Sequence, residues 1–149
     1  MISTKLEYSH TIGIASFEGR GFMNPIDIKY KNEMLFVLSR SNASNKNNRI
    51  SAVTIDSKHK FEFANWGEGQ GKSILPTAIV FDQNDNLYLS DEHLNRISVF
   101  DSSGDFVKRI GGWGTGCNQW QISYSSAIYN DRIYVADNWG QRIVTLDLN

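Results

Sequence analysis

The chain has 149 residues, a formal net charge of −1 and a single cysteine, Cys117. Its length fits one ordinary domain of about 100–200 residues. Its 40% hydrophobic and 12% aromatic content can form a packed core, which excludes a disordered chain. The near-zero charge argues against a nucleic-acid surface, and the single cysteine excludes an internal disulfide and a cysteine-rich zinc site.

The first residues, "MISTKLEYSH", contain neither the apolar segment nor the small-residue cleavage site of a secretory signal peptide. No apolar run in the chain approaches the about 20 residues of a membrane-spanning helix. A cytoplasmic location without a membrane partner is therefore expected.

Short stretches of β-branched and aromatic residues alternate with Asn, Asp and Gly turn signals, and no segment has the residue spacing of a helix. This pattern predicts an all-β protein. In chain order the expected strands cover residues 11–17, 25–30, 34–39, 49–56, 59–66, 77–81, 86–90, 96–101, 105–111, 125–129, 132–136 and 142–147.

The sequence repeats itself. "NLYLSDEHLNRISVFD" at 86–101 returns as "RIYVADNWGQRIVTLD" at 132–147, with equivalent residues 46 positions apart. A looser copy at 33–56 is lengthened by an Asn/Ser-rich stretch at 41–48, and a Gly-rich segment precedes each copy. A period in the forties with four strands per unit predicts the blades of a β-propeller.

Residues 75–116, "LPTAIVFDQNDNLYLSDEHLNRISVFDSSGDFVKRIGGWGTG", resemble an NHL repeat. The resemblance extends over 24–149 in three copies, although Ser39 stands where the later copies have Asp91 and Asp137. It implies a β-propeller, most often six-bladed, but no single activity. Relatives include sensor domains, protein-binding and RNA-binding modules, and a peptide-processing lyase.

The strands make three blades, shifted by one strand along the chain. Residues 24–66 form blade 1, 75–111 form blade 2, and 124–149 supply the first three strands of blade 3. The segment 10–17 is the expected outer strand that closes a blade.

Three blades cannot close a ring, because propellers typically need about 4–8. We therefore expect a homodimeric six-bladed propeller that exchanges its N-terminal strands under two-fold symmetry. A trimer would have about nine blades, outside that range. The alternative is that the chain is part of a single propeller of about 300 residues.

The loops at one face of a propeller usually carry the ligand site. We expect a protein or peptide ligand at this face, with five candidate residues: Trp139, Asn138, His93, Glu92 and Arg40. Trp139 either contacts a ligand or packs over a neighbouring loop. Trp66 and Trp113, which recur in the Gly-rich segments, are expected to fill the seams between blades, and Trp120 is a further candidate for a seam.

Asp91 and Asp137, with His93, are the candidate metal ligands. If the protein is an enzyme, they could hold Ca²⁺ or Zn²⁺ at the channel mouth. The favoured interpretation is structural: each Asp caps loop amides at a strand end, beside the arginine that recurs five residues later. The sequence thus favours a non-enzymatic binding module without a cofactor. A metal-assisted lyase or hydrolase and single-stranded RNA binding are the alternatives.

Overall fold

The computed structural model describes residues 5–15, 21–42 and 44–148, and these residues form eleven strands and no helix. The first sheet contains β1 (Pro25–Lys31), β2 (Met34–Ser39), β3 (Arg49–Thr54) and β4 (His59–Phe63). The second contains β5 (Pro76–Phe81), β6 (Leu87–Asp91), β7 (Arg96–Phe100) and β8 (Phe106–Ile110). The third contains β9 (Ser123–Tyr129), β10 (Arg132–Asp137) and β11 (Arg142–Asp147).

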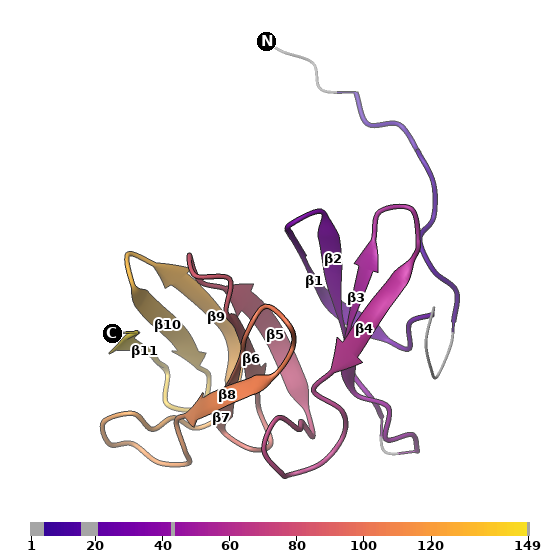
Figure 1. Cartoon of the computed structure of the whole chain (residues 1–149). Coiled ribbons are helices and arrows are strands. Elements are labelled where there is room, and N and C mark those ends of the chain that lie inside the picture. The colour runs from indigo at the N-terminus through magenta and orange to yellow at the C-terminus, as the bar shows by residue number, and fades with distance from the viewer. Residues whose placement is uncertain (1–4, 16–20, 43, 149) are drawn as a thin grey trace.

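Each sheet is an antiparallel meander in which every strand pairs with the next one along the chain. The first strands of the sheets adjoin, since β5 contacts both β1 and β9. Figure 1 shows the three sheets side by side, with β5–β8 in the middle. This is the arrangement of propeller blades around a common axis, so the sheets are called blades 1, 2 and 3 in chain order. The all-β propeller prediction is confirmed.

Asparagine and aspartate side chains build the tight turns between strands. In blade 2 the carboxylate of Asp82 accepts hydrogen bonds from the N–H groups of Asn84 and Asn86, at 2.8 and 2.9 Å. It also accepts one from the hydroxyl of Tyr88 at 3.2 Å. Burial, together with this carboxylate, raises the pKa of Tyr88 to about 12. The turn is therefore tied to the second strand of its own hairpin.

The seam between blades 1 and 2 is an apolar layer. Phe36, Leu38 and Ile50 of blade 1 pack against Ile79, Leu87 and Leu89 of blade 2, and all six are buried. Phenylalanines extend this layer outward, with Phe63 and Phe100 at a ring-centroid distance of 5.0 Å.

The seam between blades 2 and 3 is built the same way. Tyr88, Ile97 and Val99 of blade 2 pack against Ile133 and Val135 of blade 3. Trp120, from the connector between the two blades, is fully buried in this layer. Side chains of one blade thus alternate between the blade before it and the blade after it, as the two-residue period of a strand requires.

Within the part of the chain that the structure describes, no neighbouring blade covers the outer faces of blades 1 and 3. Ile28 of β1 is 54% exposed, whereas Ile79, at the same position of β5, is 1% exposed. Ile143 of β11 is 64% exposed, whereas Ile97, at the same position of β7, is 0% exposed. Both ends of the three-blade unit therefore present positions that blade 2 keeps buried.

The N-terminal segment forms no strand within the described residues. Residues 10–15 do not pair with β11 of the same chain, and their one ladder contact is an isolated bridge from Ala15 to Phe22. Residues 16 and 17, the end of the expected strand 10–17, lie outside the described part. The closing role of this segment stays a prediction.

Candidate functional site

The connectors between blades and the loops after β2, β6 and β10 lie at one end of the propeller, at the bottom of Figure 1. We call this end the loop face. Arg40, Glu92 and Asn138 occupy the same position in the three blades, one residue beyond the second strand. Their backbone N–H groups donate to the carbonyls of residues 24, 75 and 122, at 3.0–3.1 Å. The strand pairing thus brings three of the five candidate ligand residues to equivalent places beside the inner strands.

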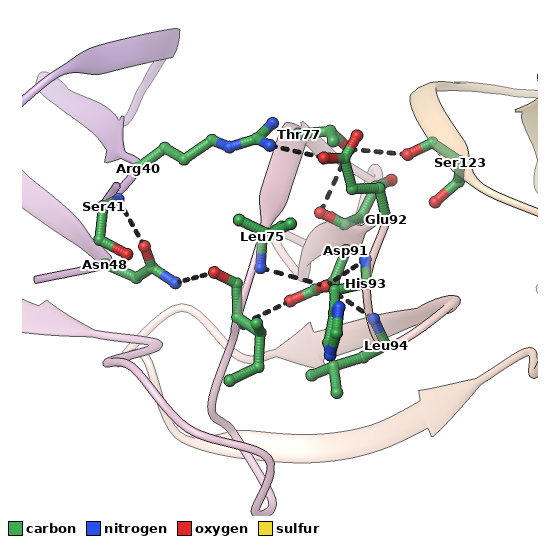
Figure 2. A network of polar contacts seen from close by, with 12 residues as sticks. Arg40, Ser41, Asn48, Leu75, Thr77, Asp91, Glu92, His93, Leu94 and Ser123 are labelled. Atoms are coloured by element: carbon green, nitrogen blue, oxygen red, sulfur yellow. Dashed lines mark hydrogen bonds and ion pairs between the residues drawn. The ribbon is translucent and has the colours of Figure 1, made fainter. Parts of the chain in front are cut away.

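Arg40 and Glu92 pair with each other. The Arg40 guanidinium donates to Glu92 Oε1 at 2.5 Å, and the ion pair crosses from blade 1 to blade 2 (Figure 2). Both side chains are largely buried, at 29% and 15% exposure. The pair links the two blades at the loop face, so a ligand meets a closed ion pair there and not two separate charges.

Asp91 holds the start of blade 2 together. Its carboxylate accepts hydrogen bonds from the N–H groups of Ile74 and Leu75 on one side, at 2.7 and 3.3 Å. On the other side it accepts from the N–H groups of His93 and Leu94, at 3.0 and 2.9 Å (Figure 2). These four donors match the capping role that the sequence favoured for this aspartate.

Asp137 has the same place in blade 3. It accepts from the N–H groups of Gln121 and Gly140 and from Arg142 Nε, at 2.8, 3.1 and 2.9 Å. Burial by itself raises the pKa of Asp137, but these donors and the positive charge of Arg142 lower it more, so the net pKa lies below its usual value. A Cβ at position 140 would lie 2.1 Å from an Asp137 oxygen, so this close approach requires glycine.

In blades 2 and 3 the arginine five residues after the strand-end aspartate binds the Gly-rich connector. Arg96 donates to the carbonyls of Glu68, Gly69 and Lys72, at 3.0, 2.9 and 3.2 Å. Arg142 donates to the carbonyls of Thr115 and Gln119, both at 2.9 Å. The recurring Asp–Arg pattern is thus engaged in backbone contacts at blades 2 and 3.

The described residues contain no group of three or more His, Cys, Asp and Glu side chains that could hold a metal ion. Of the candidate ligands, Asp91 and His93 come together at the backbone of the loop, whereas Asp137 belongs to the next blade. None of the described segments forms a helix with the length and apolarity to cross a membrane.

Two tryptophans form an exposed pair on the loop face. Trp139, in the loop after β10, and Trp113, in the connector before β9, have ring centroids 6.2 Å apart in an edge-to-face arrangement. Trp113 is 54% exposed and Trp139 is 63% exposed. The prediction that Trp113 fills a seam is wrong. The prediction that Trp120 lies in a seam is confirmed, because Trp120, seven residues later in the same connector, is fully buried in the apolar layer between blades 2 and 3.

Trp66, the counterpart of Trp113 in the preceding connector, is also not a seam residue. It is 36% exposed, and the Lys46 ammonium lies 4.2 Å from its ring centroid. The Asn/Ser-rich insertion of blade 1 thus reaches this connector. Sequence reasoning missed both aromatic contacts, because Lys46 and Trp66 are 20 positions apart and Trp113 and Trp139 are 26 apart.

Comparison with known proteins supports the fold. Residues 76–149 match the model of the DUF5128 family, which is described as a 6-bladed beta-propeller. The fold is a β-propeller. Blade 3 and all of blade 2 fall inside the matched region, and blade 1 repeats the same topology outside it. No curated protein matches the chain.

Two solved structures share this fold at low sequence identity. One is a proposed exported protein from Bacteroides fragilis NCTC 9343, 11% identical, with a TM-score of 0.64 over 83% of this chain and 32% of that one. The other, a DUF4221 family member from Bacteroides vulgatus ATCC 8482, is 9% identical, with a TM-score of 0.54 over 83% of this chain and 36% of that one. The chain therefore spans about a third of the length of each structure.

Proposed function

We propose that the protein is a non-enzymatic NHL-type binding module that presents its loop face to a protein or peptide, without a cofactor. The exposed Trp113–Trp139 pair carries this proposal. Two large aromatic side chains that contact each other and still expose more than half of their surface are a typical contact site, because tryptophan offers much apolar area at little cost in side-chain entropy.

The surroundings of the pair favour a polypeptide ligand. Asn138 adjoins Trp139, is exposed and offers both a donor and an acceptor for a peptide backbone. The Arg40–Glu92 ion pair lies at the equivalent position of the neighbouring blades and adds no net charge. An interface that combines aromatic anchors with neutral polar groups suits a peptide better than a polyanion, whose binding depends on a basic excess.

Selection from a phage-displayed random dodecapeptide library tests this proposal. Peptides enriched on the wild-type protein should bind the Trp139→Ala and Trp113→Ala variants at least about 10-fold more weakly, as expected for an aromatic anchor worth about 1.4 kcal/mol or more. Trp66→Ala is the matched control, since Trp66 has the same connector position and a different neighbour. Enriched peptides that bind all three variants equally would contradict the proposal.

We further propose that a second copy completes the ring, giving six blades in a homodimer. The exposed isoleucines at both ends of the unit support this, because a two-fold axis places blade 3 of each copy against blade 1 of the other. Light scattering should then give twice the chain mass of 16.9 kDa. A particle of single-chain mass at micromolar concentration would contradict the homodimer, and it would leave the loop-face proposal standing.

The two alternatives have direct tests. A metal-assisted lyase or hydrolase predicts bound Ca²⁺ or Zn²⁺ in elemental analysis of the purified protein. Single-stranded RNA binding predicts retention on heparin that weakens steeply with salt. The cytoplasmic location is likewise a proposal, which fractionation of the source cells would test.

A further inference from the structure

The three Gly-rich connectors share one backbone geometry. The N–H groups of Phe22, Ser73 and Trp120 donate to the carbonyl eight residues earlier in each case, at 2.8, 3.0 and 3.0 Å. Three isolated parallel bridges accompany these bonds, between Ala15 and Phe22, Trp66 and Ser73, and Trp113 and Trp120. Residues 14–15 and 22 therefore have the same bridge geometry as the two ends of the other connectors, although no described strand precedes them.

Two further features align the N-terminal segment with the other connectors. Arg49 of blade 1, which is buried, donates to the carbonyl of Gly21 at 2.9 Å, as Arg96 does to the carbonyls of Glu68 and Gly69 in blade 2. Gly13, Ala64 and Gly111 all have positive φ, at 81°, 57° and 93°. These three residues lie two positions before the bridged residues Ala15, Trp66 and Trp113.

The positive-φ residue marks where an outer strand ends. Ala64 directly follows β4 (His59–Phe63), and Gly111 directly follows β8 (Phe106–Ile110). Gly13 therefore identifies residues 8–12, "YSHTI", as the counterpart of these strands. The close approach of Gly13 to the ring of Phe22 repeats that of Gly111 to Trp120, with a built Cβ 2.5 and 2.1 Å from the ring. On this alignment the closing strand covers residues 8–12, whereas the sequence alone predicts 10–17.

Blade 3 has an open place for such a strand. Its outermost described strand is β11, whereas blades 1 and 2 each have a fourth strand there. A groove of 440 Å³ runs along β11, lined by residues 115–118 and 142–146. In blade 2 the equivalent connector, which precedes β5, contacts the outer strand β8, since a Cβ on Gly71 would lie 3.1 Å from Phe106. The groove therefore has the position that β8 fills in blade 2.

Within the described residues, the N-terminal segment lies far from this open place. His10 and Ile12 line a groove of 540 Å³ against the free face of blade 1, together with Ile26 and Ile28. β11 lies on the opposite side of the unit, with blade 2 in between (Figure 1). In the proposed ring, blade 3 of the second copy lies against this same face of blade 1, so its β11 comes next to residues 8–12.

We propose that residues 8–12 form the outer strand of blade 3 in a second copy, pairing antiparallel with its β11; this rests on the proposed homodimer. The pairings of β3 with β4 and of β7 with β8 predict the same register. Ile12 then lies opposite Ile143, Thr11 opposite Val144, His10 opposite Thr145 and Tyr8 opposite Leu146. Two such exchanged strands, one from each copy, close the ring.

Cysteine crosslinking tests the register. Opposed residues in antiparallel strands have Cα atoms about 4.5–5.5 Å apart, within the range of a disulfide. One chain carries Thr11→Cys and the other Val144→Cys, both with Cys117→Ser, because Cys117 is an exposed thiol that lines the groove. Mixing and mild oxidation should yield a disulfide-linked two-chain product on a non-reducing gel. Glu7→Cys in place of Thr11→Cys is the control, since four residues displace the thiol by about 13 Å.

The outcomes separate this inference from the homodimer itself. A crosslink from position 11 at least about 10-fold faster than from position 7 supports the exchanged strand in this register. Equal or absent crosslinking in a particle of two-chain mass overturns the exchanged strand and leaves the homodimer. A single-chain mass overturns both. A double variant, Thr11→Cys with Val144→Cys, that forms an internal disulfide without a two-chain product would show that the strand closes within one chain and overturn the exchange.

Discussion

Ile97 and Ile143 occupy the same position of blades 2 and 3, opposite Ser90 and Ala136, yet Ile97 is fully buried and Ile143 is 64% exposed. The difference arises from the neighbouring blade. Ile97 packs against Ile133 and Val135 of blade 3, whereas no fourth blade of the described chain covers Ile143. A charge at Ile143 should therefore act on association and leave the fold of the single chain intact.

The first prediction concerns this position. In the proposed homodimer, Ile143→Asp should convert the two-chain particle to single chains at concentrations where the wild type is expected to associate. Burying an isoleucine is worth about 1.5–3 kcal/mol, and each substitution acts at two symmetry-related places, so the dissociation constant should rise by at least about 100-fold. Ile55→Asp is the control, because Ile55 is 58% exposed and lies in the turn after β3. Light scattering over a dilution series measures the effect. Equal masses for both variants would contradict the prediction.

The second prediction concerns the N-terminal segment. Ile12→Asp should weaken association by at least about 10-fold, because it places a charge opposite Ile143 in the proposed strand pair. Leu6→Asp should leave association unchanged, since Leu6 is 92% exposed and lies before the proposed strand 8–12. Sedimentation equilibrium compares the two variants. If Leu6→Asp dissociates the particle as strongly as Ile12→Asp, the strand does not begin at residue 8.

The third prediction concerns Arg96. Arg96→Met should lower the free energy of unfolding by about 2–4 kcal/mol, because three connector carbonyls lose a buried, charged donor. Arg109→Ala, in the exposed strand β8, should change it by no more than about 0.5 kcal/mol. Urea unfolding followed by tryptophan fluorescence provides both values. A difference below about 1 kcal/mol between the variants would mean that water replaces the guanidinium at little cost.

The fourth prediction concerns pH. Because the folded-state pKa of Asp137 lies below its usual value of 3.8, the ionised carboxylate stabilises the fold above that value. This stabilisation is lost as the pH falls through the lower folded-state pKa. The gap in unfolding free energy between wild type and Asp137→Asn should therefore be largest near neutral pH and shrink below about pH 4.

Asp147→Asn is the control for this titration. Asp147 is exposed and has a surface ion pair with Arg132 at 2.9 Å, and such solvent-screened pairs contribute little to stability. Urea unfolding at a series of pH values from 7 to 2 gives both gaps. A gap for Asp137→Asn that stays constant over this whole interval would show that hydrogen bonding of the neutral form, and not the carboxylate, stabilises the loop.

The local parts of the fold were predictable because they depend on neighbouring residues. Every expected strand from residue 25 onward is present, since each hairpin joins consecutive strands through turns of the kind built by Asp82. The capping role of Asp91 could also be inferred, because its N–H partners at His93 and Leu94 are two and three residues away. The closing strand 10–17 stays a prediction, and the proposed bounds 8–12 rest on the connector geometry around Gly13, which the sequence does not reveal.

The arrangement of the candidate site residues was harder to predict, because it depends on contacts between residues that are far apart in the sequence. Arg40 and Glu92 were each candidate ligand residues, yet they pair across a sequence separation of 52 residues. For the same reason the seam prediction was wrong for Trp113 and is confirmed for Trp120. Both stand in one Gly-rich connector, and only the packing of blade 2 on blade 3 buries Trp120 and exposes Trp113.

The sequence by itself determined the repeating unit, because strand alternation, turn residues and the 46-residue spacing are local properties that recur along the chain. The tertiary structure decided which copies of an equivalent residue are covered. Burial depends on the presence of a neighbouring blade, so the same isoleucine position is closed in blade 2 and open in blade 3.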